Sequence, residues 1–453
     1  MHINMTEAGC KADGITDDTA AIKRVLESLN DGACMYFPAG QYIVTEPLSI
    51  AANHIVICGQ PNASCILYKK HQTEERRQSL MNFASGIHDV TVRDIKLSYE
   101  GDMFPDQGQS YDGRISGLSF CQCDRVKITN VEACGFNANG IEVITGNPQK
   151  YAHDFTVSGC YLHHNRVGGF VYGYVDGVLL TESVMEYNGS ELDGGTGYGS
   201  AGAAGELPIN VQIIGNRANY NYRKGIDLHA GMSAVISGNI CHANRLYGIY
   251  AEGAKTGNMI ISNNIISGMN RKNTGCNMPY NWITGISVGP YSDKPEDGEH
   301  FNFIIDSNMI IGFGLEEQYS QAIHCYHSQK KGSIKITDNI LRLGRVTAVI
   351  DCDSRLTPEE NELRDVLFSI SGNQVSAEES TETPFEITNY KCFSFTGNQI
   401  EIDKVGSKHI LSLSGCSKSS CQVSGNTVRT EKGVRLVSDL TGTNIIQKDN
   451  IIF

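Results

Sequence analysis

A short phrase ending in Asn recurs along most of this 453-residue chain. It starts with an apolar residue and passes through one or two small residues, as in Ile236-Ser-Gly-Asn239. From Asn216 onward the successive Asn residues are 23, 25, 44, 31, 34, 25 and 28 positions apart. Such a period is too short for two helices and a strand in each repeat. The phrase predicts a solenoid of short coils, with Asn at one turn: Asn130, Asn216, Asn239, Asn264, Asn308, Asn339, Asn373, Asn398 and Asn426.

A second phrase keeps step with the first: a Gly or Ala followed by a short strand of alternating residues, starting at Gly140, Gly169, Gly225, Gly248, Gly285, Ala322 and Ala348. Several short strands per repeat, joined by Gly and Asn turns, are typical of a right-handed parallel β-helix. Asn at a fixed turn can stack into a ladder of amide hydrogen bonds. The predicted fold is therefore all-β, a single-stranded right-handed parallel β-helix.

The amino-terminal segment is expected to cover the open end of this solenoid, because an uncovered coil would expose apolar interior and an unpaired sheet edge. Asp17 is a plausible helix N-cap, and Ile22, Val25, Leu26 and Leu29 fall on one helical face. We predict a capping α-helix within residues 1–34 and a β-helix over residues 35–453. Loop insertions are expected near residues 186–208, 269–284 and 290–302.

Charge and composition exclude several classes of partner. The net charge is −13 and no basic run occurs, so neither nucleic acid nor an anionic membrane is expected as a partner. The sequence contains no apolar stretch long enough for a transmembrane helix, and its amino terminus does not read as a secretory signal. The 15 Cys residues lack zinc-type spacing and are expected to be free thiols, which suits folding in a reducing cytosol. Neither a cofactor nor a metal is predicted.

Two N-terminal segments carry a family resemblance. ADGITDDTAAI (Ala12–Ile22), followed by YFPAGQY (Tyr36–Tyr42), resembles the start of the pectate-lyase-like superfamily, especially bacteriophage tailspike depolymerases. The resemblance implies a β-helix that binds and usually cleaves a bacterial surface polysaccharide, commonly as a homotrimer. It also implies a place in the virion, as a tail spike, after cytoplasmic assembly. The alternative location is extracellular, without a classical signal peptide.

Ionisable side chains gather on neighbouring predicted strands. If the Ile of each Gly-Ile phrase points inward, Asp227, His229, Tyr250 and Glu252 all point outward. Asp227 and Glu252 lie one coil and two residues apart, which predicts a separation of roughly 8 Å. That spacing suits a pair in which one carboxylic acid protonates a leaving oxygen and the other activates water. We therefore predict Asp227, Glu252 and His229 as catalytic residues, with His229 tuning Asp227 or acting as a base. The alternative is a solvated face without function.

Aromatic and basic side chains suggest a sugar-binding cleft around this pair. Of the 20 Tyr, 14 lie between Tyr151 and Tyr326, and aromatic rings stack on sugars, although simple packing explains many Tyr equally well. Arg223 and Lys224 could hold a carboxylated sugar or be two solvated turn residues. The predicted substrate-binding residues are Tyr222, Arg223, Lys224, Tyr250, Glu142, His324, Tyr326, Trp282 and Tyr291.

The sequence thus favours an enzyme: a depolymerase that cleaves glycosidic bonds within a capsular polysaccharide or exopolysaccharide by carboxylate-pair hydrolysis. A lyase is the first alternative, in which His229 or a Tyr removes the proton beside a uronate carboxylate. A spike or adhesin that binds glycan without cleaving it is the second.

Overall fold

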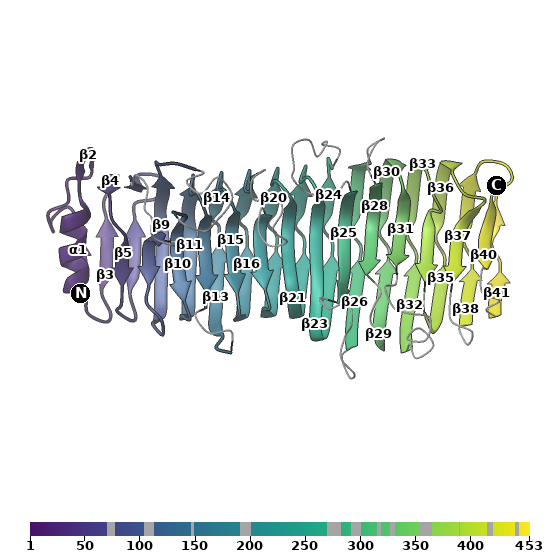
Figure 1. Cartoon of the computed structure of the whole chain (residues 1–453), viewed down its shortest axis with the longest axis horizontal. Coiled ribbons are helices and arrows are strands. Elements are labelled where there is room, and N and C mark those ends of the chain that lie inside the picture. Colours follow the sequence, from purple (N-terminus) through teal and green to yellow (C-terminus); the bar gives the residue numbers. More distant parts are fainter. Residues whose placement is uncertain are drawn as a thin grey trace. The chain divides into compact units, whose positions relative to one another are not determined.

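The computed structural model describes residues 1–69, 78–103, 113–145, 149–190, 201–269, 282–290, 300–314, 319–326, 331–353, 365–388, 390–414, 420–439 and 444–453. Within these ranges the chain is almost wholly β-strand, with one α-helix (Figure 1). Its internal contacts divide it into an N-terminal unit, residues 1–223, and a C-terminal unit that starts at residue 224. We describe each unit separately.

The N-terminal unit contains three parallel sheets, in which each strand pairs with strands of the coils before and after it. Sheet N1 comprises β1 (His2–Asn4), β3 (Cys34–Phe37), β6 (Val56–Gly59), the first parts of β9 (His88–Tyr99) and β11 (Asp124–Cys134), β13 (Ala152–Ser158), β16 (Val175–Thr181) and β19 (Ile209–Ile214). Sheet N2 comprises β2 (Asp13–Asp17), β4 (Gly40–Val44), β7 (Ser64–Tyr68), the later parts of β9 and β11, β14 (Tyr161–His163), β17 (Val184–Glu186) and β20 (Arg217–Asn219). Sheet N3 comprises β5 (Leu48–Ile50), β8 (Gln78–Phe83), β10 (Ile115–Cys121), β12 (Asn139–Ile144), β15 (Gly168–Gly173) and β18 (Ala201–Glu206).

The C-terminal unit repeats this arrangement. Sheet C1 comprises the first parts of β21 (Lys224–Ser237) and β23 (Tyr247–Ser262), β25 (Trp282–Pro290), β28 (Tyr319–Tyr326), β31 (Ala348–Asp353), β34 (Phe385–Thr388), β37 (His409–Ser414) and β40 (Arg435–Asp439). Sheet C2 comprises the later parts of β21 and β23, β26 (His300–Asp306), β29 (Lys331–Thr337), β32 (Asp365–Ser371), β35 (Cys392–Thr396), β38 (Ser420–Ser424) and β41 (Asn444–Lys448). Sheet C3 comprises β22 (Ile240–His242), β24 (Ile265–Ser267), β27 (Met309–Phe313), β30 (Ile340–Val346), β33 (Gln374–Ser380), β36 (Gln399–Val405), β39 (Thr427–Thr430) and β42 (Ile451–Ile452). Three parallel sheets per unit confirm the predicted β-helix.

The helix α1 (Thr19–Glu27) packs by its apolar face on the first strands of the N-terminal unit. Ile22 is fully buried. Together with Leu26 it lies against Met35, Phe37 and Leu48 of these strands. The predicted N-cap, Asp17, is one residue too early, because Asp18 occupies that position. The Asp18 carboxylate instead accepts hydrogen bonds from the backbone of Lys11 and Ala12, which ties the preceding segment to the helix.

The predicted Asn ladder is confirmed in the C-terminal unit. The side-chain oxygen of Asn264 accepts hydrogen bonds of 3.0 Å from the backbone and side-chain nitrogens of Asn239. The same pair of bonds links Asn308, Asn339, Asn373, Asn398, Asn426 and Asn450 in succession. Asn130 does not belong to a buried ladder, because it is exposed and donates to Asp94.

The insertions predicted near residues 186–208, 269–284 and 290–302 lie partly outside the described residues. Strands β18, β25 and β26 begin inside the three predicted ranges, at residues 201, 282 and 300. Among the described residues we find no helix long and apolar enough to cross a membrane.

Candidate active site

The candidate site lies on β21 and β23, neighbouring strands of sheet C1. Ile226 and Leu228 point into the core and are fully buried, so Asp227 and His229 point to the opposite face of the sheet. Asp227 pairs in register with Tyr250 of β23. Alternation then places Glu252, two residues further along β23, on this same face.

Three of the four predicted outward residues form one charged cluster. His229 Nε2 lies 3.1 Å from Asp227 Oδ1, and His229 Nδ1 lies 3.1 Å from Glu252 Oε2. The imidazole therefore bridges the two carboxylates. Lys224, at the start of β21, donates a hydrogen bond of 2.7 Å to the other Asp227 oxygen.

Burial differs sharply across the cluster. The Asp227 side chain has no exposed surface and that of Lys224 is 3% exposed, whereas His229 and Glu252 are 13% and 12% exposed. The prediction that Asp227 faces an open groove is thus wrong, because Lys224 and His229 cover its carboxylate. The interpretation of Lys224 as a solvated turn residue is also wrong, because its side chain is buried and donates to Asp227.

The electrostatic effects within the cluster favour its charged forms. Burial raises the pKa of Asp227, but the charges and hydrogen bonds of His229 and Lys224 outweigh burial, so that its pKa is lowered. Burial lowers the pKa of His229, but the Asp227 carboxylate and the hydrogen bond to Glu252 raise it to about 9. These effects favour the protonated form of His229 at neutral pH, whereas the Lys224 ammonium, 3.1 Å from His229 Nε2, acts against it.

Tyr250 completes the exposed side of the site. Its hydroxyl donates a hydrogen bond to Glu252 Oε1. The Lys224 ammonium lies 4.2 Å from the centre of the Tyr250 ring, and the ring of Tyr247 packs 4.8 Å from it. A cation over the ring fixes its orientation. The site thus presents a phenol, a carboxylate and an imidazolium, supported by a buried Lys224–Asp227 ion pair.

A second polar cluster lies on the same sheet, around Asp351 of β31. Gln321 and the Tyr319 hydroxyl donate to Asp351 Oδ2 over 2.7 Å and 3.2 Å, and His324 Nδ1 lies 3.7 Å from the same oxygen. His324 was predicted to bind substrate, but Asp351, Gln321 and Tyr319 were missed. Asp351 pairs in register with His324, so aligning the Ile residues of β28 and β31 would have revealed it.

Three other predicted residues belong to the N-terminal unit. Glu142 is 1% exposed and accepts hydrogen bonds from Ser116 and Asn139 over 2.5 Å and 2.9 Å. Tyr222 and Arg223 are also buried, with 8% and 4% exposure, so Arg223 is not a solvated turn residue.

The remaining predictions fall outside what the structure describes. Tyr291 is not among the described residues, and the side chains of Trp282 and Tyr326 are not described although their backbones belong to β25 and β28. Their proposed contacts with substrate stay predictions.

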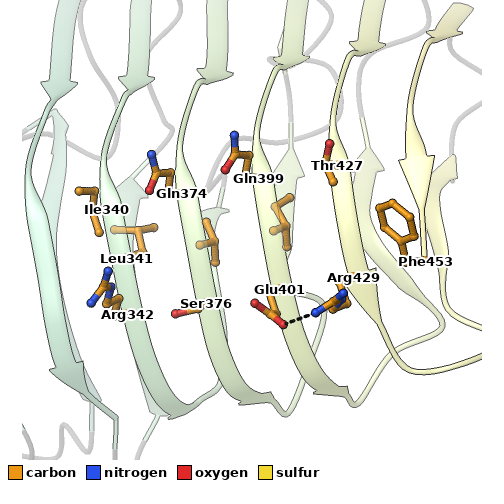
Figure 2. Close-up of a pocket in the computed structure, with 12 residues that line it drawn as sticks. Ile340, Leu341, Arg342, Gln374, Ser376, Gln399, Glu401, Thr427, Arg429 and Phe453 are labelled. Carbon is orange, nitrogen blue, oxygen red and sulfur yellow. Dashed lines mark hydrogen bonds and ion pairs between the residues drawn. The ribbon is translucent and has the colours of Figure 1, made fainter.

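A separate groove of about 670 Å³ crosses β30, β33, β36 and β39 of sheet C3 (Figure 2). Gln374 and Gln399 line one row of it, and Arg342, Glu401 and Arg429 line the other. Arg429 donates to Glu401 over 3.3 Å. These strands carry none of the predicted site residues, so the groove is distinct from the Asp227 cluster.

Two groups of side chains in the described ranges have donor atoms close enough together to hold a metal ion. One comprises His54, His88 and Asp89, and the other Glu132, Cys134 and His163. Both groups belong to the N-terminal unit, and neither includes a residue of the Asp227 cluster.

Two family models match the sequence. The family described as rhamnogalacturonase A/epimerase, pectate lyase-like, matches residues 2–98, and the right-handed β-helix region matches residues 116–289. The second match agrees with the predicted hand of the solenoid. The fold and the second match together identify the chain as a right-handed parallel β-helix protein, and its residues 2–98 are similar to the pectate-lyase-like family.

Among individual proteins, the chain is similar to the pre-neck appendage protein of Bacillus phage phi29, with 24% identity over 58% of this chain and 33% of that protein. It is also similar to alginate lyase 7 of Azotobacter vinelandii, with 24% identity over 42% of this chain and 23% of that protein. Among solved structures, the Agl-KA catalytic domain shares the fold, with a TM-score of 0.53, 14% identity and coverage of 98% of this chain and 68% of that one. The chain spans a third or less of the length of these two curated relatives.

Proposed function

We propose that this protein is an enzyme that acts on an acidic, uronate-containing polysaccharide at a reaction centre formed by His229, Tyr250 and Glu252. The observation that carries the proposal is the position of the His229 imidazole, whose two ring nitrogens each lie 3.1 Å from a carboxylate oxygen, of Asp227 and Glu252, beside the Tyr250–Glu252 hydrogen bond. A positive charge beside a proton-accepting pair suits removal of the proton next to a uronate carboxylate.

In the proposed reaction, the uronate carboxylate faces the His229 imidazolium, which stabilises the charge that builds up when the C5–H bond breaks. Tyr250 takes up that proton at its hydroxyl oxygen and passes its own hydroxyl proton to Glu252, so that one proton ends on the Glu252 carboxylate. In elimination, the electron pair forms the C4–C5 double bond, the C4–O bond breaks, and the leaving oxygen takes a proton from His229. In epimerisation, a proton from the solvent instead adds to C5 from the opposite side. Lys224 and Asp227 are positioning residues, because both are buried beneath His229.

The names of the similar proteins support a uronate substrate. They include an alginate lyase and a mannuronan C5-epimerase of Azotobacter vinelandii, the latter 26% identical over 55% of this chain and 18% of that protein. Elimination and C5 epimerisation both begin with loss of the C5 proton. This shared step is the one for which the site is proposed.

Carboxylate-pair hydrolysis remains the second candidate. The observation in its favour is that Asp227 and Glu252 come from neighbouring strands and contact one imidazole. Against it, an inverting pair needs space for a water molecule between its carboxylates, and here His229 lies between them. Asp227 is also fully buried.

The Asp351 cluster is proposed as a sugar-binding subsite for the same polysaccharide. Asp351 lies three strands along sheet C1 from Tyr250, through Ser287 and His324, which corresponds to roughly 14 Å at the usual strand spacing. A polysaccharide that crosses these strands would bring a sugar several residues from the reacting one against Asp351 and His324. Hydrogen bonds to sugar hydroxyls suit both side chains.

We also propose that the protein is part of a phage particle, because the pre-neck appendage protein of phage phi29 is among its similar proteins. The homotrimer implied by the family resemblance is part of this proposal. Light scattering coupled to gel filtration measures the subunit number.

The experiment follows three readouts on alginate, mannuronan, pectate and neutral polysaccharides. Elimination gives new reducing ends together with ultraviolet absorbance from the unsaturated uronate. Hydrolysis gives reducing ends without that absorbance. Epimerisation gives neither, but exchanges C5 hydrogen for solvent deuterium. We expect absorbance or C5 exchange with an acidic polymer; reducing ends alone, or only binding, would contradict the proposal.

Variants locate the reaction centre. His229→Gln, Tyr250→Phe and Glu252→Gln should each lower the rate at least about 100-fold, which is the usual contribution of a general acid or base. His153→Gln, at an exposed histidine of β13, is the matched control and should leave the rate unchanged. If the three site variants retain wild-type rates, the reaction centre lies elsewhere.

A further inference from the structure

A cluster of three donor side chains lies on sheet N2 of the N-terminal unit: Glu132, Cys134 and His163. Glu132 and Cys134 are two residues apart on β11, so their side chains point to the same side of the strand. His163 of β14 pairs in register with Cys134. Three different donor types, a carboxylate, a thiol and an imidazole, are therefore brought together by two neighbouring strands.

The distances between these donors match a tetrahedral metal site. His163 Nε2 lies 3.2 Å and Cys134 Sγ lies 3.8 Å from the same oxygen, Glu132 Oε1. All three donor atoms lie within 4.8 Å of one another. Zinc bonds of about 2.0 Å to nitrogen or oxygen and about 2.3 Å to sulfur, at tetrahedral angles, separate these donor pairs by roughly 3.3 Å and 3.5 Å.

We propose that Glu132, Cys134 and His163 bind Zn²⁺ or a similar divalent transition-metal ion. Thiolate and imidazole ligands favour such ions over Ca²⁺ and Mg²⁺, which prefer oxygen alone. On binding, the Cys134 S–H proton passes to the buffer and a sulfur–metal bond forms. Three protein ligands leave one tetrahedral position for water.

The surroundings of the cluster support this site. His163 Nδ1 lies 2.8 Å from His164 Nδ1, and the ring of Tyr161 stacks 3.9 Å from His163. Contacts of this kind orient a ligating imidazole.

Lys96 competes with a metal ion for this cluster, because its ammonium lies 2.6 Å from Glu132 Oε1. A bound metal ion must therefore displace Lys96 from this carboxylate.

The cluster of His54, His88 and Asp89 is the weaker candidate for a metal site. It lacks a thiol, and Arg125 binds both oxygens of Asp89 over 2.7 Å and 2.9 Å. That pairing competes for the carboxylate that a metal ion would need. We therefore make the proposal for the cysteine cluster only.

The experiment is a Co²⁺ titration of the full chain in a non-chelating reductant, followed by competition with Zn²⁺. We expect one equivalent to produce the near-ultraviolet charge-transfer absorbance of a cobalt–thiolate bond, and Zn²⁺ to abolish it. A metal ion at His54, His88 and Asp89 gives no such band. Failure of wild-type protein to develop the band at saturating Co²⁺ would overturn the proposal.

Variants test the ligands. Cys134→Ser and Cys134→Ala should remove the band, and His163→Ala should weaken binding at least about tenfold. Cys65→Ser is the control, at a nearby thiol that contacts Ser98, and should retain the band. Lys96→Met should tighten binding by up to about fivefold, because it removes a partly exposed competing ion pair. A band that survives loss of Cys134, or that disappears with Cys65, assigns the metal elsewhere.

Discussion

His229 should stay protonated well above neutral pH. Its pKa is raised from 6.5 to about 9, mainly by Asp227 acting against burial. That difference corresponds to roughly 3 kcal/mol in favour of the folded imidazolium. Because the folded pKa exceeds the unfolded value, this stabilisation is fully present below pH 6.5 and is lost as the pH rises through 9.

The assay is histidine ring hydrogen–deuterium exchange, followed residue by residue by mass spectrometry between pH 5 and about 10. We expect a midpoint near 9 in the wild type. Asp227→Asn should lower the midpoint more than Glu252→Gln does, because Asp227 acts through both its charge and a hydrogen bond. A wild-type midpoint at or below 6.5, or equal effects of the two substitutions, would show that the electrostatic reasoning is wrong.

Three further predictions concern the stability of the fold and the binding of substrate. Lys224→Met leaves the buried Asp227 carboxylate with His229 alone and should lower the free energy of unfolding by about 3 kcal/mol, whereas adding Asp227→Leu should recover much of the loss; denaturant titration compares the two. Asn308→Ala removes both bonds accepted from Asn264 and should cost about 2–4 kcal/mol, whereas Asn302→Ala, outside the ladder, should cost less than 1 kcal/mol in the same titration. Asp351→Asn should raise the KM for long polysaccharide chains several-fold with little change in kcat, which steady-state kinetics measures; a fall in kcat alone would argue against a binding role.

The fold could be predicted from sequence because its strongest signal is local and repeated. Each ladder Asn follows an apolar residue that must enter the core, so the phrase marks the same turn of every coil. Alternation along β21 and β23 likewise predicts that Asp227, His229 and Glu252 share one face of the sheet.

Burial of the site could not be predicted in the same way. Alternation says which face of a strand carries Asp227, but not that Lys224 would fold over that face and neutralise the carboxylate. Asp351 was missed for a register reason. A phrase that starts at Ala348 puts Val349 in the inward position, whereas in the structure Ile350 aligns with Ile323 and Asp351 with His324.

The Asn ladder separates the length of a coil from the geometry of its turn. Consecutive ladder amides are 25 residues apart between Asn239 and Asn264, and 44 apart between Asn264 and Asn308, yet the hydrogen bonds at both steps are 2.9–3.0 Å long. Extra residues therefore enter a coil without disturbing its junction with the next. A scaffold of this kind can exchange whole surface segments as cassettes, so that new specificities are acquired while the amide spine stays the same.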